Sequence, residues 1–538
     1  MFHRTRLVAA VIALLGPLGM APGAGPQGIV IDTDRSVNCT NLKSIVEDVC
    51  RGCKTQQEKA IALYNFMVRT VWMDWHSHRP LEMTNISYKG KRQDLLVFAN
   101  DPVKYIVVYG NCGCGPQAGV YGALCEAAGL KFHHLNPGFG HVSGEVFCEG
   151  KWRWLDVWLP AYVTDAKGDI YSYDEIMADR TRFSKARDEG RCPENFMVNY
   201  SADLGAVVNA KGYKAGDAGG YAQKYVENLT LRPGESCTWL WGNVGKWYSP
   251  SGPYLDGYLD RQFPCGPACK FGNDQVLKKA FPYWQPYQKT IPDGPHSQWN
   301  KTYYRYYGNA VFVHEPALTA RGLANFGAKL TNVKPAGQSG LVLAQPPAGH
   351  VEMSFALPYV IADTEIEGQA EMGPVGAALS FCFSTDGGKS WLLGGEVKKA
   401  GQFGPISIGK PNTYEFPAGS TSGQYGFALK IVFRCDSQRH PPALKSLKIT
   451  NTTMLNFYSR PWLELGKNNV TVTCKNEDAL ADTALEMTWK WLEDWHTQNP
   501  SEKSFHHKVA KSGAACAIEA GGSKLPKMKS ITIACPKR

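Results

Sequence analysis

The segment from residue 110 to residue 156 constrains the fold most, because it predicts a helix followed by a β-hairpin. An apolar run at helical spacing stops at Gly129, and a glycine just past the last periodic residue ends a helix. Pro116 suits the first turn of that helix. Further along, Glu149-Gly150 separates two short strand-like runs, which is typical of a two-residue hairpin turn.

Three residues of this segment are suited to chemistry. Cys114 lies at the start of the predicted helix, where the helix dipole and the free backbone amides favour a thiolate. In the hairpin, Asp156 lies opposite Ser143, and His141 is then a diagonal neighbour of Asp156, at a separation that two side chains can close. A carboxylate in that place orients the imidazole and stabilises its protonated form. We therefore predict a thiol nucleophile with its base, built from Cys114, His141 and Asp156.

The order Cys, His, Asp on a helix, a strand and a neighbouring strand resembles the transglutaminase-like superfamily. The matching motifs are Cys-Gly-x-Gln-Ala at Cys114–Ala118, Ala-Gly-Leu at Ala128–Leu130, Gly-His-Val at Gly140–Val142, Glu-Val-Phe at Glu145–Phe147 and Gly-Lys-Trp-x-Trp-Leu-Asp at Gly150–Asp156. They lie within residues 40–175. Cys112 departs from the single cysteine that is usual in this motif.

The resemblance implies a papain-like/transglutaminase-like α+β core and a cysteine hydrolase or acyltransferase that acts on protein or peptide amides without a cofactor. By this resemblance Cys114 is the nucleophile, His141 the general base and Asp156 the orienting acid. Transfer to water and transfer to an amine both stay open, and hydrolysis is favoured because water is always present. Beyond the backbone amide of Cys114, Gln117 and Tyr109 are weak candidates for oxyanion donors.

Two other interpretations of the cysteines stay open. Cys114 could belong to a structural disulfide with Cys112, Cys125 or Cys148, since the chain has 16 cysteines. The spaced pairs Cys50-x2-Cys53 and Cys265-x3-Cys269 are compatible with zinc, but no partner pair follows at finger-like spacing. We therefore predict no metal.

The cysteine count and the N-terminus both indicate export. Sixteen cysteines are many for a reducing compartment. Arg4 and Arg6 precede an apolar stretch over 7–18 and small residues over 21–25, the layout of a signal peptide. We predict a secreted, extracellular or periplasmic protein with no membrane span. The basic residues gather in 501–538, which we interpret as a solvated face, and no motif indicates a nucleic-acid partner.

The pattern along the chain predicts several domains. We assign residues 1–24 to the signal peptide, 32–190 to the transglutaminase-like core, 191–340 to a mixed region rich in Gly, Pro and aromatic residues, 341–454 to a β-sandwich and 455–538 to a second sandwich-like domain with a basic tail. Short alternating runs such as 375–383, 425–433, 469–474 and 485–492 are the strand candidates. The predicted fold class is thus multidomain, an α+β core followed by all-β sandwich domains.

Two rival functions come from other classes. The first is a non-catalytic surface or matrix protein that keeps the core as a scaffold and contacts glycans or a cell surface through its sandwiches. The second is a glycosidase or sialidase-like protein, because residues 384–391 resemble the Asp-box of sialidase-like propellers. A propeller needs several repeated blades, so a single good copy favours a hairpin turn instead.

Overall fold

The structure is a computed structural model that describes most of the chain. The described residues are 25–73, 81–83, 96–98, 101–136, 141–158, 161–191, 214–216, 221–242, 244–246, 308–373, 376–411, 419–436 and 440–537. The predicted signal peptide over 1–24, the Cys265-x3-Cys269 pair and much of the region 191–340 lie outside them.

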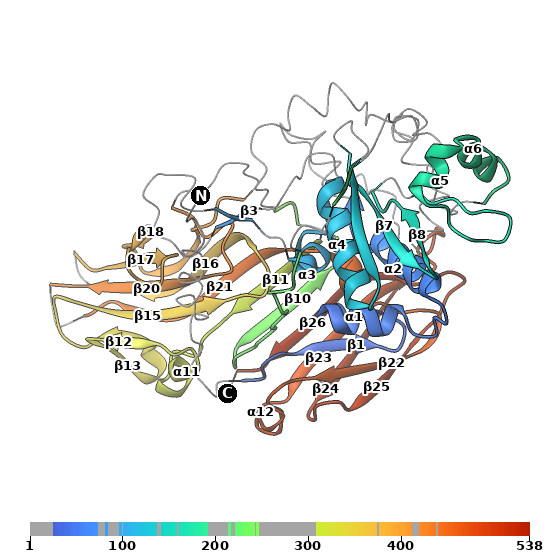
Figure 1. Cartoon of the computed structure of the whole chain (residues 1–538). Helices are drawn as coiled ribbons and strands as arrows, with labels where there is room; N and C mark the ends of the chain where they lie inside the picture. Colours follow the sequence, from blue (N-terminus) through green and yellow to red (C-terminus); the bar gives the residue numbers. More distant parts are fainter. Residues whose placement is uncertain are drawn as a thin grey trace, which may run out of the picture.

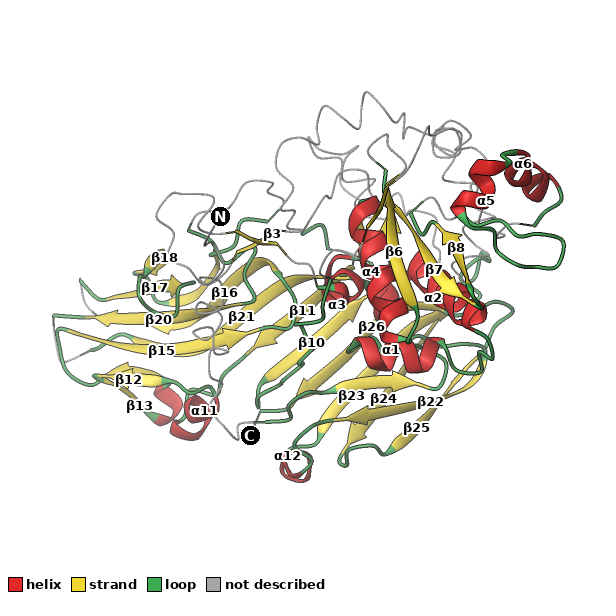
Figure 2. Cartoon of the chain, viewed as in Figure 1, coloured by secondary structure: helices red, strands yellow, loops and turns green. Residues whose placement is uncertain are grey.

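The protein is mostly β, with 41% strand and 19% helix, and the predicted fold class is wrong. Figure 2 shows strands through most of the molecule and the helices gathered mainly at one side. The cause of the error lies in long-range pairing. Strand β1 (Val30–Thr33), which overlaps the start of the α+β core predicted over 32–190, pairs antiparallel with β22 (Gly466–Thr473) near the other end of the chain. Figure 1 shows this blue strand among the red ones.

The largest sheet crosses the predicted boundaries at 340/341 and 454/455, although the boundaries themselves stay predictions. It has ten strands. In order they are β13 (Val333–Pro335), β14 (Leu341–Leu343), β21 (Ala443–Leu455), β11 (Gly308–His314), β10 (Glu235–Leu240), β26 (Lys527–Cys535), β23 (Leu485–Glu493) and β24 (Ser501–Val509), with β16 (Ile361–Glu371) on β21 and β19 (Gly401–Ser407) on β16.

A five-stranded sheet packs against part of the large one, since β15 contacts both β13 and β14. Its strands, in order, are β12 (Lys329–Thr331), β15 (Ala348–Ala356), β20 (Gly426–Arg434), β17 (Ala378–Ser384) and β18 (Leu392–Val397). Buried and exposed positions alternate along β15, as they do in a sheet with one face on a core. Strands are therefore confirmed close to the predicted runs 375–383 and 425–433, and β22 and β23 confirm those at 469–474 and 485–492.

A smaller three-stranded sheet joins both ends of the described chain, in the order β1, β22 and β25 (Ala515–Ala520). A turn separates β17 from β18 and carries the Asp-box motif. There Asp386 Oδ1 accepts hydrogen bonds from the Lys389 and Ser390 amides, both at 3.0 Å. Residues 384–391 thus form the hairpin turn that the single copy of the motif favours.

The site lies in the remaining part of the chain, where helices pack on a four-stranded sheet. The sheet has the order β8 (Lys151–Leu155), β7 (Ser143–Cys148), β6 (Lys131–Asn136) and β9 (Lys214–Gly216). The other described elements here are α1 (Leu42–Val49), α2 (Gln56–Thr70), α3 (Pro102–Lys104), a π-helical turn (Tyr105–Tyr109), α4 (Cys114–Ala127), α5 (Tyr173–Ala178), α6 (Thr181–Asp188) and the short pairs β2 (Trp72–Met73) with β5 (Asn111–Cys112) and β3 (Leu81–Met83) with β4 (Leu96–Phe98); α11 (Ala320–Asn325) and α12 (Asp478–Asp482) belong to the β-rich part.

Local sequence signals explain how these helices start and stop. Thr55 caps α2: its hydroxyl accepts a hydrogen bond from the Glu58 amide, and the Glu58 carboxylate accepts one from the Thr55 amide, which makes a capping box. Gly129 follows α4 with φ 78°, a left-handed conformation that glycine adopts without a steric cost. Figure 2 shows α4 standing beside β6 and β7, and it contacts both strands.

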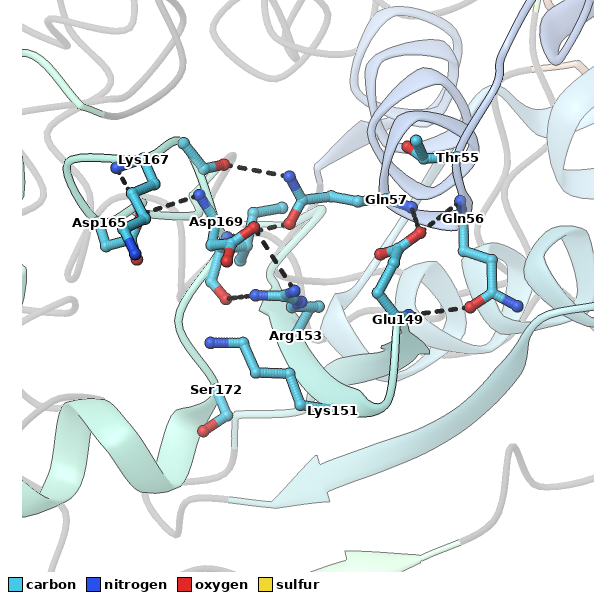
Figure 3. Close-up of polar contacts among 12 residues, drawn as sticks. Thr55, Gln56, Gln57, Glu149, Lys151, Arg153, Asp165, Lys167, Asp169 and Ser172 are labelled. Carbon is cyan, nitrogen blue, oxygen red and sulfur yellow. Dashed lines mark hydrogen bonds and ion pairs between the residues drawn. The ribbon is translucent and has the colours of Figure 1, made fainter.

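Glu149, at the tip of the β7–β8 hairpin, fastens that hairpin to the start of α2 (Figure 3). Its Oε1 accepts hydrogen bonds from the Gln56 amide at 2.7 Å and the Gln57 amide at 3.2 Å. The Gln56 side chain in turn accepts from the Glu149 amide at 2.9 Å. The carboxylate thereby satisfies two amides that a helix N-terminus leaves without partners.

We expect Glu149→Ala to lower the free energy of unfolding by about 1 kcal/mol, the usual cost of losing a side-chain cap. Glu149→Gln is the matched control, since it keeps an acceptor oxygen and should lose less. Urea unfolding of the two variants checks this. An alanine variant as stable as the wild type would mean that these bonds do not hold the hairpin.

Candidate functional site

The N-terminus of α4 presents Cys114. The helix begins at this residue, with Gly113 as an N-cap that makes no side-chain hydrogen bond. The first-turn amides and the positive end of the helix dipole therefore stand at the sulfur without a capping side chain. Cys114 is half-buried and packs against a small apolar cluster that includes Trp154 and Trp158. The predicted place of Cys114 on a helix tip is confirmed.

The hairpin carries the other two residues in the predicted register. Cys148 pairs with Lys151 and Gly144 with Leu155, so the strands face each other as the Glu149-Gly150 turn predicts. Both turn residues have positive φ, 45° and 84°, as a tight hairpin turn of this kind requires. Ser143 Oγ accepts a hydrogen bond from the Trp154 indole at 3.1 Å, which ties the two strands together beside the site.

The three predicted residues meet. His141 Nε2 lies 2.6 Å from Asp156 Oδ2. The His141 ring also hydrogen-bonds the Cys114 side chain. Because Nε2 faces the carboxylate, Nδ1 is the ring nitrogen left for the sulfur. Helix α4 and the hairpin are also close at their backbones, since a Cβ built on Gly115 would lie 4.0 Å from the Val142 side chain.

The electrostatics of His141 follow from its surroundings. Burial alone would lower its pKa, but the Asp156 charge and hydrogen bond, together with Cys114, more than offset burial and raise the pKa of His141 from 6.5 to about 10. The ring is then an imidazolium at neutral pH. A positive charge at this place stabilises negative charge on the neighbouring sulfur.

Trp158 is a site residue that the sequence reasoning did not single out. Its amide donates to Asp156 Oδ1 at 3.0 Å, so both carboxylate oxygens of the fully buried Asp156 are engaged. Its ring centroid lies 5.3 Å from that of His141. The spacing Asp-x-Trp is the signal that could have pointed to it, because an aspartate often accepts from the amide two residues on.

The structure gives a contact for each of the two weak oxyanion candidates. Gln117 is buried, and its amide nitrogen donates to the Val71 carbonyl at 3.1 Å, which ties α4 to the end of α2. Tyr109 is buried in the π-helical turn with its ring centroid 6.1 Å from that of Tyr105. Neither contact directs a donor to the sulfur of Cys114.

Across the described residues, no group of three or more His, Cys, Asp or Glu side chains is placed to hold a metal ion. In the same part of the chain, no helix has the length and apolar character needed to cross a membrane.

Comparison with known proteins gives little. No family model matches the chain, and no curated protein matches it. Weak structural likenesses exist to a β-glucuronidase from Ruminococcus gnavus (7% identity, TM-score 0.12, covering 34% of this chain and 35% of that one) and to a glycosyl hydrolase family 2 member from Bacteroides cellulosilyticus (9%, 0.13, 35% and 24%). A β-glucuronidase from Bacteroides uniformis is similar at 14% identity and a TM-score of 0.13, with 36% and 23% covered.

These likenesses carry no argument about the activity of this chain. The chain spans at most about a third of the length of these structures. The predicted enzyme class, a transglutaminase-like cysteine hydrolase or acyltransferase, is supported by no comparison, since no family model or curated protein matches and the structures named are β-glucuronidases and a glycosyl hydrolase family 2 member. They share a class with the weaker alternative, a glycosidase, but TM-scores this low carry no argument for that activity either. The resemblance of the motifs to the transglutaminase-like superfamily stays a prediction.

Proposed function

We propose that Cys114, His141 and Asp156 form a nucleophilic thiol site in an exported protein, at which the Cys114 sulfur bonds covalently to an electrophilic carbon of a substrate. One observation carries the proposal. His141 hydrogen-bonds the sulfur on one side and lies 2.6 Å from the Asp156 carboxylate on the other. A thiol, an imidazole and an orienting carboxylate in this sequence make an activated nucleophile.

Each side chain has its own part in the step. The proton of the thiol is on His141 when the sulfur–carbon bond forms. The leaving group departs with the electrons of its bond to the attacked carbon, and a basic leaving group takes the proton back from His141. Asp156 holds the ring in one orientation and balances its positive charge.

The test is covalent labelling of the native, full chain by iodoacetamide, with the modified residue located by peptide mass spectrometry. We expect labelling at Cys114 at low reagent concentration, and its complete loss in Cys114→Ala. Cys112→Ala is the matched control, because Cys112 lies two residues away and is fully buried. It should leave the labelling unchanged.

The outcome that contradicts the proposal is plain. If native Cys114 reacts no faster than it does in the urea-unfolded chain, the surroundings of the sulfur do not activate it. Equal labelling of the wild type and Cys114→Ala would place the reactive thiol elsewhere.

A further inference from the structure

The loop between α1 and α2 brings two other cysteines together. Cys50 is the C-cap of α1, and Cys53 lies two residues before the N-cap of α2. The Cys53 amide donates to the Cys50 carbonyl at 3.0 Å, which closes a β-turn. Gly52 has φ 87°, as the third residue of a type II turn requires. Such a turn holds its first and last Cα atoms within about 7 Å, close to the range of about 4.4–6.8 Å found in disulfides.

The same turn is open to a reagent from solution. Both Cys50 and Cys53 are only half-buried. A Cβ built on Gly52 would meet no atom within 4 Å, so the turn faces open space. Another thiol, Cys125, is near enough to Cys50 to interact with it electrostatically. Cys125 is fully buried and hydrogen-bonded to Tyr121. A soluble oxidant therefore reaches the turn and not Cys125.

We propose that Cys50 and Cys53 are a dithiol–disulfide pair that is oxidised by thiol–disulfide exchange with a small soluble disulfide. The Cys53 thiolate attacks one sulfur of the oxidant, forming a mixed disulfide and releasing one thiolate. Cys50 then attacks the Cys53 sulfur and releases the second. The chain loses two electrons and two protons, and the oxidant becomes two thiols.

The surroundings of Cys50 support this order of attack. Burial and the neighbouring Cys53 raise the pKa of Cys50 to about 11, and the C-terminal end of α1 acts in the same direction. Cys50 is therefore the slower thiol and takes the second step. As a thiol of high pKa it is also a poor leaving group, so the closed disulfide resists reduction.

Trypsin makes the test direct, because it cuts after Arg51, between the two cysteines. The purified full chain is equilibrated with reduced and oxidised glutathione in varied ratios, quenched with N-ethylmaleimide at mildly acidic pH and digested. We expect the peptides over 44–51 and 52–54 to be recovered joined, two hydrogens lighter than their sum, when glutathione disulfide is in excess. Strong reductant should restore the two separate alkylated peptides.

Variants identify the partners. Cys50→Ser and Cys53→Ser should each abolish the joined peptide, while Cys125→Ser should leave it unchanged. The proposal is overturned if both peptides stay separately alkylated at every glutathione ratio, or if Cys50 is recovered joined to Cys125. The wild-type titration decides this even if a variant does not fold, and it does not depend on Cys114 chemistry.

Discussion

Replacing Asp156 by asparagine should slow alkylation of Cys114 at pH 7 by roughly 30-fold while leaving the chain folded. The side chain keeps its shape and an oxygen for the Trp158 amide, but the negative charge 2.6 Å from His141 is lost. Burial then acts on the ring without an opposing charge and favours neutral imidazole. Without the imidazolium the sulfur behaves as an ordinary thiol, which is only about 3% thiolate at pH 7.

The pH profile gives this prediction its sign. His141 has a raised pKa, so its imidazolium is present at low pH and is lost as the pH rises through about 10. In Asp156→Asn the same loss should occur at or below an ordinary histidine value, near 6.5. The chemical shifts of the His141 ring protons between pH 5 and pH 11 measure both transitions, and the rate of iodoacetamide labelling of Cys114 at pH 7 follows the thiolate.

A second carboxylate–histidine pair on the same sheet supplies the matched control. Glu145 Oε2 lies 2.8 Å from His133 Nε2, and the two residues are paired on the neighbouring strands β7 and β6. Glu145→Gln should leave the labelling profile of Cys114 unchanged. If Asp156→Asn is folded and labels as fast as the wild type, the carboxylate has no part in activating the thiol.

The site could be predicted from the sequence because its geometry is set over short chain distances. A capping residue, a two-residue turn and a glycine stop each act within one or two turns of the backbone. The Glu149-Gly150 turn sets the pairing of Cys148 with Lys151, and that register alone brings Asp156 beside His141. Trp158 was not predicted because its contact with the His141 ring depends on the path of the chain after β8 ends at Leu155.

The fold was mispredicted for the opposite reason. Alternating residues indicate that a strand exists but say nothing about its partner. Cys237 of β10 pairs with Phe312 on one side and with Ile533 on the other, which lie 75 and 296 residues further along the chain. A division into successive domains could not contain such a sheet. The helical elements also contact it, since the Asn456 side-chain amide, just after β21, donates a hydrogen bond to the Ile106 carbonyl at 2.6 Å.

The second large effect is expected at Arg460, which lies in the core between such distant segments. Its guanidinium makes two bonds to Glu227, Nη1 to Oε1 at 2.6 Å and Nη2 to Oε2 at 2.9 Å, and both side chains are 4% exposed. Nη1 also lies 3.1 Å from the Tyr359 hydroxyl, and the Trp239 ring lies 4.8 Å from the guanidinium carbon. Burial lowers the pKa of Arg460, but the neighbouring Glu227 carboxylate more than offsets this effect and holds the pKa above its ordinary range.

We expect Arg460→Met to lower the free energy of unfolding by about 3–5 kcal/mol, because it leaves the Glu227 carboxylate buried without its counter-charge. Glu227→Gln should cost a similar amount for the mirror reason. The double variant should cost clearly less than the sum of the two, since the second change removes the stranded charge. Urea unfolding at neutral pH of the four proteins of this cycle measures the coupling.

Lys398→Met, which breaks an exposed pair with Glu396 at 2.7 Å, should change little and serves as the control. Additive losses in the cycle would mean that Arg460 and Glu227 stabilise the core independently, by packing and not as a pair.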